Sequence, residues 1–345
     1  MLAKYLSFDI GEKNIKLVEG CYKGNVTEIL KVVSVQIPRR TLKDSFILNK
    51  EALGLAMQEA ISKLSAASKD AIVTMSSNSI FIREFELPTG DEKELEGMVK
   101  NEIAQYYGVT ARDLVEYKKI ADIDHNEIKK VKVRAAVMNR EIAEDYYNLI
   151  NSLGLKPVAL DIHPNVISKL FTGQFAINGE EYVLQNLLLL DIGYTGSVVY
   201  FVMGGNLEFS RFIHLGGKSI DSLLANLYSI TEEEAENSKV SKMKELIPFD
   251  DENPLWSVLR PLYADMLEEL RKVIQFSLSR RGNRVIHSIY LMGGGAGLDG
   301  LAEYLSQGLG IDVQRMETMS RIKYEMNIDK NLASMINAAG ALIRL

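Results

Sequence analysis

Apolar positions along this chain follow two periods, one typical of strands and one typical of helices. Helical spacing at 53–64 is followed by the apolar run 71–73, and helical patterns at 220–227 and 255–274 precede a second continuous run at 288–292. Short continuous runs predict strands buried inside a sheet, whereas spacing of three to four residues predicts helices with one apolar face. Because the two kinds of segment alternate, the pattern predicts an α/β fold built from layers of helices on sheets.

One arrangement occurs twice. The sequence Asp-Ile-Gly at 9–11 returns at 191–193. Each copy is followed by a second apolar run, by a Gly-Asn pair at 24–25 or 205–206, and by a third run. Glycine and asparagine tolerate the positive φ that tight hairpin turns require, so each half is predicted to begin with three strands joined by hairpins. The repetition of the whole arrangement, rather than of three residues alone, indicates a duplicated unit.

A block from 85 to 155 does not fit the repeat. Thr89 and Glu92 have the spacing of a capping box before a helical pattern, alternating strands follow at 115–120 and 130–137, and a further helical pattern ends the block. The block is therefore predicted to be a compact α+β insertion. Its second strand carries three basic residues on one side, Lys130, Lys132 and Arg134. This stripe has two interpretations, a solvated face that protects a sheet edge and a face that docks a partner.

Composition limits the classes of protein that remain. The 345 residues include 40 Lys or Arg and 46 Asp or Glu, which gives a net charge of −6. A dedicated nucleic-acid binder usually presents a basic face, so no nucleic-acid partner is expected. The single cysteine, Cys21, excludes an internal disulfide framework and fits a reducing compartment. No secretory signal is recognised, and the most apolar stretch, 182–201, contains Asp191 and other polar residues, so no direct transmembrane insertion is expected.

Five segments together carry a resemblance to a known class of protein. They are the hairpin 9–16, the linking segment 155–164, the hairpin 191–193 with Arg211 and Leu215-Gly216-Gly217 beyond it, the segment 231–239 with its Glu-x-x-Lys spacing, and the glycine-rich turn 292–296 with the alanine-rich segment 337–341. In these features the chain resembles the actin-like ATPases over essentially its whole length. Among them it resembles the PilM type of pilus assembly protein, which is related to the cell-division protein FtsA.

The resemblance implies an actin-like fold, that is, a duplicated ribonuclease H-like α/β fold with an inserted small α+β lobe in place of actin's own outer lobe. The implied organisation is 1–84 for the N-terminal part of the first half, 85–155 for the inserted lobe, 156–185 for a connecting segment that returns to the first half, 186–315 for the second half, and 316–345 for a C-terminal segment that returns to the first half.

The resemblance also implies that ATP or ADP binds with Mg²⁺ in the cleft between the two hairpins. Backbone N–H groups in tight glycine turns form concavities that accept phosphate oxygens. Asp9 and Asp191 would hold a hydrated Mg²⁺ that keeps most of its waters, and Lys16 would be the cation over the phosphates. The implied nucleotide-binding residues are Asp9, Gly11, Glu12, Lys13, Asn14, Lys16, Asp191, Gly193, Tyr194, Thr195, Gly196, Gly216, Gly217, Glu236, Lys239, Gly293, Gly294, Gly295 and Ala296.

Two residues depart from the pattern of the family. Glu12 stands where relatives usually carry Ser or Thr, and a carboxylate there would repel a polyphosphate unless it turned outward or met a cation. His163 stands where relatives usually carry an acidic residue that helps to position the attacking water, while Asp161 lies two residues earlier. Asp161 and His163 are therefore the candidate catalytic residues. Nucleotide binding is expected to be more effective than hydrolysis, which is weak or absent.

The function implied by the resemblance is that of a cytoplasmic actin-like scaffold of the type IV pilus, recruited to the inner face of the cell membrane. It would bind Mg-ATP, the cytoplasmic tail of a PilN-like inner-membrane protein at a groove near the inserted lobe, and other subunits of the pilus machinery. Two alternatives belong to the same superfamily. FtsA-like division proteins end in a linker and a membrane-targeting helix, for which 341–345 leave no room. Small-molecule kinases carry a catalytic Asp in a larger substrate lobe, and no such residue is located in this sequence.

Overall fold

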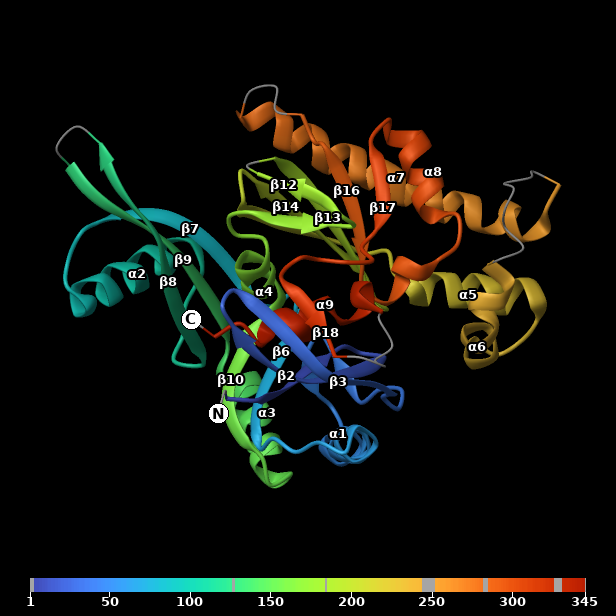
Figure 1. The fold of residues 1–345 in the computed structure, drawn as a ribbon, viewed down its shortest axis with the longest axis horizontal. Helices are drawn as coiled ribbons and strands as arrows, with labels where there is room; N and C mark the ends of the chain where they lie inside the picture. The colour runs from blue at the N-terminus through green and yellow to red at the C-terminus, as the bar shows by residue number, and fades with distance from the viewer. Residues whose placement is uncertain are drawn as a thin grey trace.

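Two sheets with the same order of strands form the body of the protein (Figure 1). The computed structural model describes residues 3–125, 128–183, 185–243, 252–281, 285–325 and 331–344. Read from the third strand of each half, the first sheet has the order β3-β2-β1-β6-β10, with β18 added beside β3, and the second has the order β15-β14-β13-β16-β17. In both sheets the first strand is antiparallel to the second and parallel to its other neighbour. The predicted duplication is confirmed.

The strands of the first sheet are β1 (Tyr5–Ile10), β2 (Asn14–Lys23), β3 (Val26–Gln36), β6 (Asp70–Met75), β10 (Lys156–Ile162) and β18 (Ile322–Tyr324). Those of the second sheet are β13 (Asn186–Ile192), β14 (Ser197–Met203), β15 (Asn206–Ile213), β16 (Ser288–Met292) and β17 (Asp312–Arg315). Two short hairpins complete the body, formed by β4 (Leu42–Lys43) with β5 (Phe46–Ile47) and by β11 (Phe175–Ile177) with β12 (Glu180–Tyr182).

The turn between the second and third strands coincides with the Gly-Asn pair in the first half, but lies one residue before that pair in the second half. In the first half Gly24 and Asn25 have φ of 54° and 65°, as the Gly-Asn pair predicts. In the second half the positive φ values, 58° and 73°, belong to Gly204 and Gly205, while Asn206 begins β15. A tight hairpin of this kind needs positive φ at both central positions, and a Gly-Gly pair meets that need without a Cβ clash.

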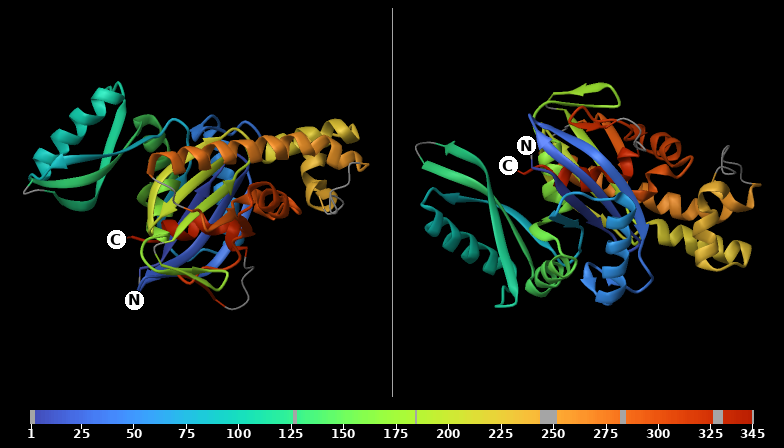
Figure 2. Two further views of the ribbon diagram at one scale, coloured as in Figure 1. Left: turned by 90° about the horizontal axis from the view of Figure 1, so that it is seen from above. Right: turned by 60° about the horizontal axis from the view of Figure 1, so that its bottom comes forward.

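Helices cover both outer faces of the sheets and fill the space between them (Figures 1 and 2). The outer face of the first sheet packs against α1 (Lys50–Leu64) and α3 (Arg140–Ser152), and that of the second against α5 (Gly217–Tyr228), α7 (Pro254–Arg281) and α8 (Leu301–Leu309). Between the sheets lie α4 (His163–Leu170) and α9 (Leu332–Ala341), whose apolar residues share one core with both sheets. The helix α6 (Glu232–Met243) packs on α5, and a 3₁₀ turn, η2 (Gly294–Gly297), follows β16.

The inserted lobe has a hydrophobic core of its own and projects from one side of the body, opposite α5 and α6 (Figure 2). It consists of β7 (Phe81–Pro88), α2 (Glu92–Tyr106), β8 (Asp113–His125) and β9 (Ile128–Asn139). The helix α3 follows β9 directly, but its buried residues pack into the core of the first half. The segment 85–155 therefore contributes to two cores, that of the lobe and that of the first half.

Two local features of the lobe differ from the sequence prediction. The capping box of α2 is formed by Asp91 and Glu94 instead of Thr89 and Glu92. The strand with the basic stripe, β9, is the central strand of the sheet β7-β9-β8, so its charges do not protect an edge. Arg134 on this strand forms hydrogen bonds with Glu84 at 2.6 and 2.8 Å.

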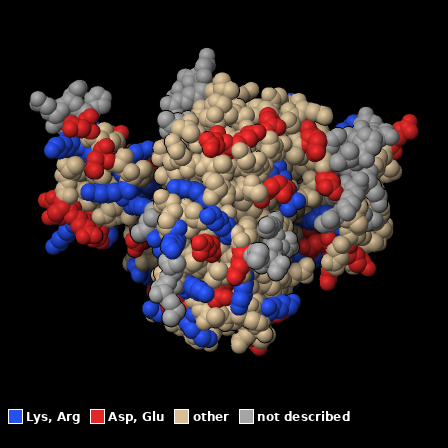
Figure 3. Space-filling model, viewed as in Figure 1, with Lys and Arg blue, Asp and Glu red and all other residues tan. Residues whose placement is uncertain are grey.

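No helix in the described ranges is both long enough and apolar enough to cross a membrane. On the face drawn in Figure 3, Lys and Arg side chains are interspersed with Asp and Glu. This face of the molecule therefore does not present the continuous basic field that a phosphate backbone would require.

Candidate functional site

The two Asp-Ile-Gly copies form equivalent turns that face each other between the halves. In the first turn the N–H of Gly11 donates to the carbonyl of Asn14 at 3.1 Å, and in the second the N–H of Gly193 donates to the carbonyl of Gly196 at 3.0 Å. Each turn follows a strand whose last residues include the aspartate, Asp9 on β1 or Asp191 on β13. The sequence repeat therefore places two carboxylates opposite each other between the two halves.

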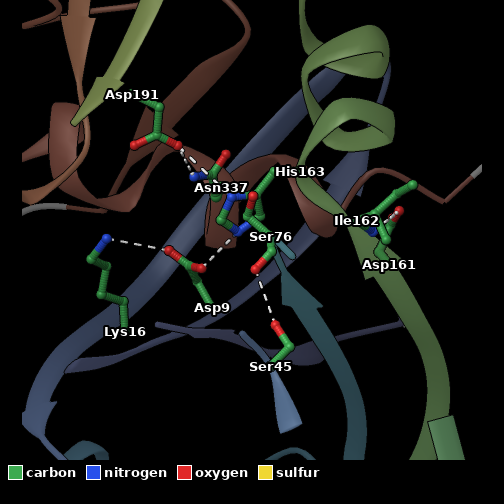
Figure 4. Close-up of polar contacts among 9 residues, drawn as sticks. All are labelled: Asp9, Lys16, Ser45, Ser76, Asp161, Ile162, His163, Asp191 and Asn337. Atoms are coloured by element: carbon green, nitrogen blue, oxygen red, sulfur yellow. Dashed lines mark hydrogen bonds and ion pairs between the residues drawn. The ribbon is translucent and has the colours of Figure 1, made fainter. Parts of the chain in front are cut away.

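A histidine lies between these two carboxylates (Figure 4). His163, the first residue of α4, has its Nε2 2.9 Å from Asp9 Oδ1 and its Nδ1 3.8 Å from Asp191 Oδ2. Lys16 Nζ lies 3.3 Å from the other oxygen of Asp9, and Asn337 Nδ2 donates to Asp191 Oδ2 at 2.8 Å. Both carboxylates are buried. The structure thus brings together Asp9, Lys16, His163 and Asp191 and adds Asn337.

The charge state of Asp9 follows from its partners. Burial alone would raise the pKa of this carboxyl group, because the charged form loses water. The charges and hydrogen bonds of Lys16 and His163 outweigh burial and lower the pKa of Asp9 to about 2. Asp9 is therefore ionised at neutral pH, with Lys16 and His163 as its partners.

We expect the interactions of Asp9 to stabilise the fold above about pH 4 and to be lost as the pH falls toward 2. The folded pKa, about 2, lies below the ordinary value of 3.8 for an aspartate, so the unfolded chain takes up the proton first. The difference in free energy of unfolding between wild type and Asp9→Asn should shrink by about 1 kcal/mol between pH 6 and pH 3. Urea unfolding at the two pH values measures this difference. A constant difference would show that Asp9 gains nothing from Lys16 and His163.

The carboxylate of Glu12 contacts a different turn from the one that carries it. One carboxylate oxygen accepts a hydrogen bond from the backbone N–H of Asp44 at 2.8 Å, in the turn between β4 and β5. Ser45 in the same turn donates to the carbonyl of Ser76 at 3.0 Å, which ties the turn to the end of β6. The predicted repulsion between Glu12 and a polyphosphate is therefore reduced, because the carboxylate is engaged with this turn.

The tips of the two turns carry groups suited to phosphate. The backbone N–H groups of Lys13 and Thr195 have no acceptor within the described part of the chain. The ammonium of Lys13 lies 5.6 Å from the centre of the Tyr194 ring and pairs with Glu236 on α6. The first turn, the second turn and α6 therefore meet around Lys13.

The other α6 residue singled out in the sequence has a partner within its own half. Lys239 Nζ lies 2.6 Å from Asp221 Oδ1 on α5. Burial raises the pKa of Asp221, which the charge of Lys239 opposes, and the second oxygen of Asp221 has no partner among the described residues. On α6, Glu236 thus contacts the first half through Lys13, whereas Lys239 contacts α5 through Asp221.

Glycines in the second half allow close packing among the turn 193–196, the end of β15 and the start of α5. A Cβ at Gly216 would lie 2.6 Å from the carbonyl oxygen of Tyr194, and one at Gly196 would lie 2.2 Å from the ring of Phe212. The N–H of Gly217 donates to the carbonyl of Gly193 at 3.0 Å. That N–H is consequently occupied by the protein, so Gly217 contributes to the site by positioning α5.

In the glycine-rich turn after β16, two glycines have no room for a side chain and the third borders open space. Gly293 has φ of 83°, and a Cβ there would lie 2.2 Å from Asp191 Oδ1. A Cβ at Gly295 would lie 2.3 Å from the side chain of Ile192, whereas one at Gly294 would meet nothing within 4 Å. Ala296 is buried in η2. Gly294 is therefore the residue of this turn that allows a ligand to approach the backbone.

Asp161 lies apart from the facing carboxylates (Figure 4). It accepts hydrogen bonds from Lys169 Nζ at 2.6 Å, from Asn165 Nδ2 at 2.7 Å and from Arg344 at 3.0 Å. Burial would raise the pKa of Asp161, but Lys169 and these hydrogen bonds lower it. With its oxygens engaged in this way, Asp161 is not free to position a water molecule in the cleft.

The donor atoms around Asp9 and Asp191 fit a hydrated Mg²⁺ better than a metal held by protein ligands alone. Among the described residues no group of three or more His, Cys, Asp or Glu is arranged to hold a metal ion directly. The carboxylate oxygens of Asp9 and Asp191 are hard oxygen ligands, as is Asn337 Oδ1, which has no hydrogen-bond partner in the described structure. Mg²⁺ is usually bound by one or two carboxylates together with waters and substrate phosphates.

Sequence reasoning missed two polar groups of the cleft, Asn337 and Tyr200. Asn337 stands in the otherwise largely apolar helix α9, and a buried polar residue in such a helix needs a polar partner, which was the available signal. Burial raises the pKa of Tyr200 well above its usual range, and the charges of Asp191 and Asp9 raise it further. The Tyr200 hydroxyl has no hydrogen-bond partner in the described structure. The continuous apolar run of β14 gives no sign that the charges of two aspartates act on one of its tyrosines.

Two sheets of this order, two helices between them and facing Asp-Ile-Gly turns define the actin-like ATPase fold. The chain belongs to the family of the type IV pilus assembly protein PilM, whose model matches residues 7–342. The predicted fold class and family are both confirmed.

Solved structures show the same fold at low sequence identity. A PilM–PilN type IV pilus biogenesis complex contains a chain that is 20% identical, with a TM-score of 0.81, over 99% of this chain and 98% of that one. The ethanolamine utilization protein EutJ from Carboxydothermus hydrogenoformans is 16% identical, with a TM-score of 0.59 over 99% and 89%. MreB5 of Spiroplasma citri bound to AMPPNP is 14% identical, with a TM-score of 0.52 over 98% and 94%.

Proposed function

We propose that this chain is a nucleotide-binding scaffold of the type IV pilus that holds Mg²⁺ with ATP or ADP between its two Asp-Ile-Gly turns. The observation that supports this most directly is the pair of buried carboxylates, Asp9 and Asp191, joined through His163 between the halves. The AMPPNP-bound structure of S. citri MreB5 shares the fold. Calorimetric titration with Mg-ATP tests the proposal.

Each group around the cleft has a role that follows from its chemistry. Mg²⁺, when bound, neutralises phosphate charge, and Asp9 and Asp191 hold it through water. Lys16 and the free N–H groups of the two turns bind phosphate oxygens, as in other concave backbone anion sites. Glu236 and Lys239 are suited to the nucleoside, and Gly294 leaves room for it.

The same geometry favours binding over hydrolysis. Positioning a water molecule for attack requires an acceptor close to the phosphate whose lone pairs are free. Asp161 is engaged by Lys169, Asn165 and Arg344, and the imidazole of His163 is held between Asp9 and Asp191. We therefore expect this chain to hold nucleotide with little turnover.

The partner in this proposal is the cytoplasmic tail of a PilN-like inner-membrane protein, which would bring the chain to the inner face of the membrane and to other pilus subunits. A groove of about 590 Å³ at the base of the lobe offers a site. It lies between α3 and β10, which is the edge strand of the first sheet. Two apolar residues in it are exposed, Tyr147 by 58% and Val158 by 39%. An extended peptide can add to such an edge while placing apolar side chains in the groove.

We expect the variant Tyr147→Arg, Val158→Arg to bind the tail peptide at least tenfold more weakly, because two charges would replace apolar contacts in the groove. Fluorescence anisotropy with a labelled peptide measures the affinity. The matched control is Leu48→Arg, Leu55→Arg, which adds two charges at residues that are 59% and 65% exposed and lie outside the groove. Equal affinity of the groove variant and the control would place the tail elsewhere on the surface.

A further inference from the structure

Ion pairs join the first half to α6 across one edge of the cleft. Lys13, in the turn of the first hairpin, pairs with Glu236, and Arg39, which follows β3, pairs with Glu232 at 3.1 Å. The two glutamates are four residues apart and so lie on one face of the helix. Lys13 also lies over the ring of Tyr194 in the other hairpin turn. These contacts hold the two turns and α6 together.

The inner pair is shielded from water and the outer pair is partly exposed. The side chains of Lys13 and Glu236 are 13% and 15% exposed, whereas those of Arg39 and Glu232 are 51% and 34% exposed. Ser222 on α5 donates to Glu232 at 2.8 Å and orients its carboxylate toward this edge. A shielded pair interacts more strongly than an exposed one, so the two pairs together resist separation of α6 from the first half.

We propose that the pairs Lys13–Glu236 and Arg39–Glu232 form a clasp that holds α6 against the first half and regulates entry and release of the nucleotide. The inference rests on the proposed nucleotide site. A polyphosphate carries more negative charge than one carboxylate, so phosphates between the turns compete with Glu236 for Lys13. Arg39 and Glu232 lie outside the residues assigned to the nucleotide. The outer pair therefore acts on nucleotide exchange only by holding α6 in place.

The test uses the outer pair, with controls of identical charge. Glu232→Gln and Arg39→Gln break the clasp, while Glu233→Gln and Arg40→Gln make the same charge changes at exposed neighbours for which the described structure shows no ion pair. Stopped-flow measurement with fluorescently labelled ATP and Mg²⁺ should show association and release about two- to fivefold faster in each clasp variant, the range expected for one partly exposed pair. The double variant Arg39→Gln, Glu232→Gln should be no faster than either single variant.

Hydrogen exchange of the α6 amides without nucleotide gives a readout that does not depend on the nucleotide site. Exchange should be faster in the clasp variants and unchanged in the controls. Equal hydrogen exchange in the clasp variants and the controls would overturn the clasp. Nucleotide association and release rates in the double variant that equal the product of the two single effects would also overturn it, because such rates would reflect long-range charge. Absence of nucleotide binding by the parent chain would overturn the nucleotide site and the clasp's role in exchange. Faster α6 exchange in the clasp variants would then show separately that the pairs hold the helix.

Discussion

Gly293→Ala is expected to destabilise the protein by about 3–5 kcal/mol, the range of severe single substitutions. The backbone at Gly293 has φ of 83° and ψ of −179°, a region that is essentially restricted to glycine and costs an L-residue about 1–3 kcal/mol. The added methyl group would also lie 2.2 Å from Asp191 Oδ1 and 2.6 Å from the carbonyl oxygen of Ile192. The second contact is with strand backbone, which cannot rotate away. Urea unfolding followed by circular dichroism measures the loss.

The adjacent glycine supplies the control for this prediction. A methyl group at Gly294 would meet no atom within 4 Å, so Gly294→Ala should keep its stability within about 1 kcal/mol of wild type. If the backbone at Gly294 approaches the nucleoside, the same variant should bind Mg-ATP more weakly while remaining folded. Equal unfolding midpoints for the two variants would show that Gly293 is not constrained by Asp191 and Ile192.

The sequence was sufficient to predict the two-fold architecture and the facing carboxylates. Both depend on local patterns that repeat, namely an apolar run that ends in Asp-Ile-Gly and a hairpin after it. Because β1 pairs with β2 in the same register as β13 pairs with β14, Asp9 and Asp191 occupy equivalent positions in the two sheets. The family resemblance placed these copies in one chain-wide fold, which the match over 7–342 confirms.

Side-chain directions were not predictable in the same way. The carboxylate of Glu12 binds the backbone of Asp44, thirty-two residues further along the chain. Asp161 binds Lys169 and Arg344, which come from α4 and from the end of the chain. These partners are brought together only by tertiary packing, so no spacing in the sequence marks them. The same reason explains why α3 packs with the first half although it directly follows the lobe's last strand.

The second large effect is expected from the carboxylate pair. The variant Asp9→Asn, Asp191→Asn should bind Mg-ATP at least 100-fold more weakly than wild type, because both anions that hold the hydrated cation are removed. Lys16 and His163 remain in place, so binding of ATP in the presence of a chelator should change much less. The expected result is therefore loss of the Mg²⁺ dependence. The variant Asp122→Asn, Asp124→Asn removes two exposed carboxylates in the lobe and controls for the change in charge.

Isothermal titration calorimetry of wild type and Asp9→Asn, Asp191→Asn, each with ATP in Mg²⁺ and in chelator, tests the nucleotide cleft most directly. A cleft between the two Asp-Ile-Gly turns predicts that wild type binds ATP more tightly with Mg²⁺ than without it, and that the double variant shows no such preference. Equal affinity for Mg-ATP in wild type and the double variant would contradict the assignment of the cleft.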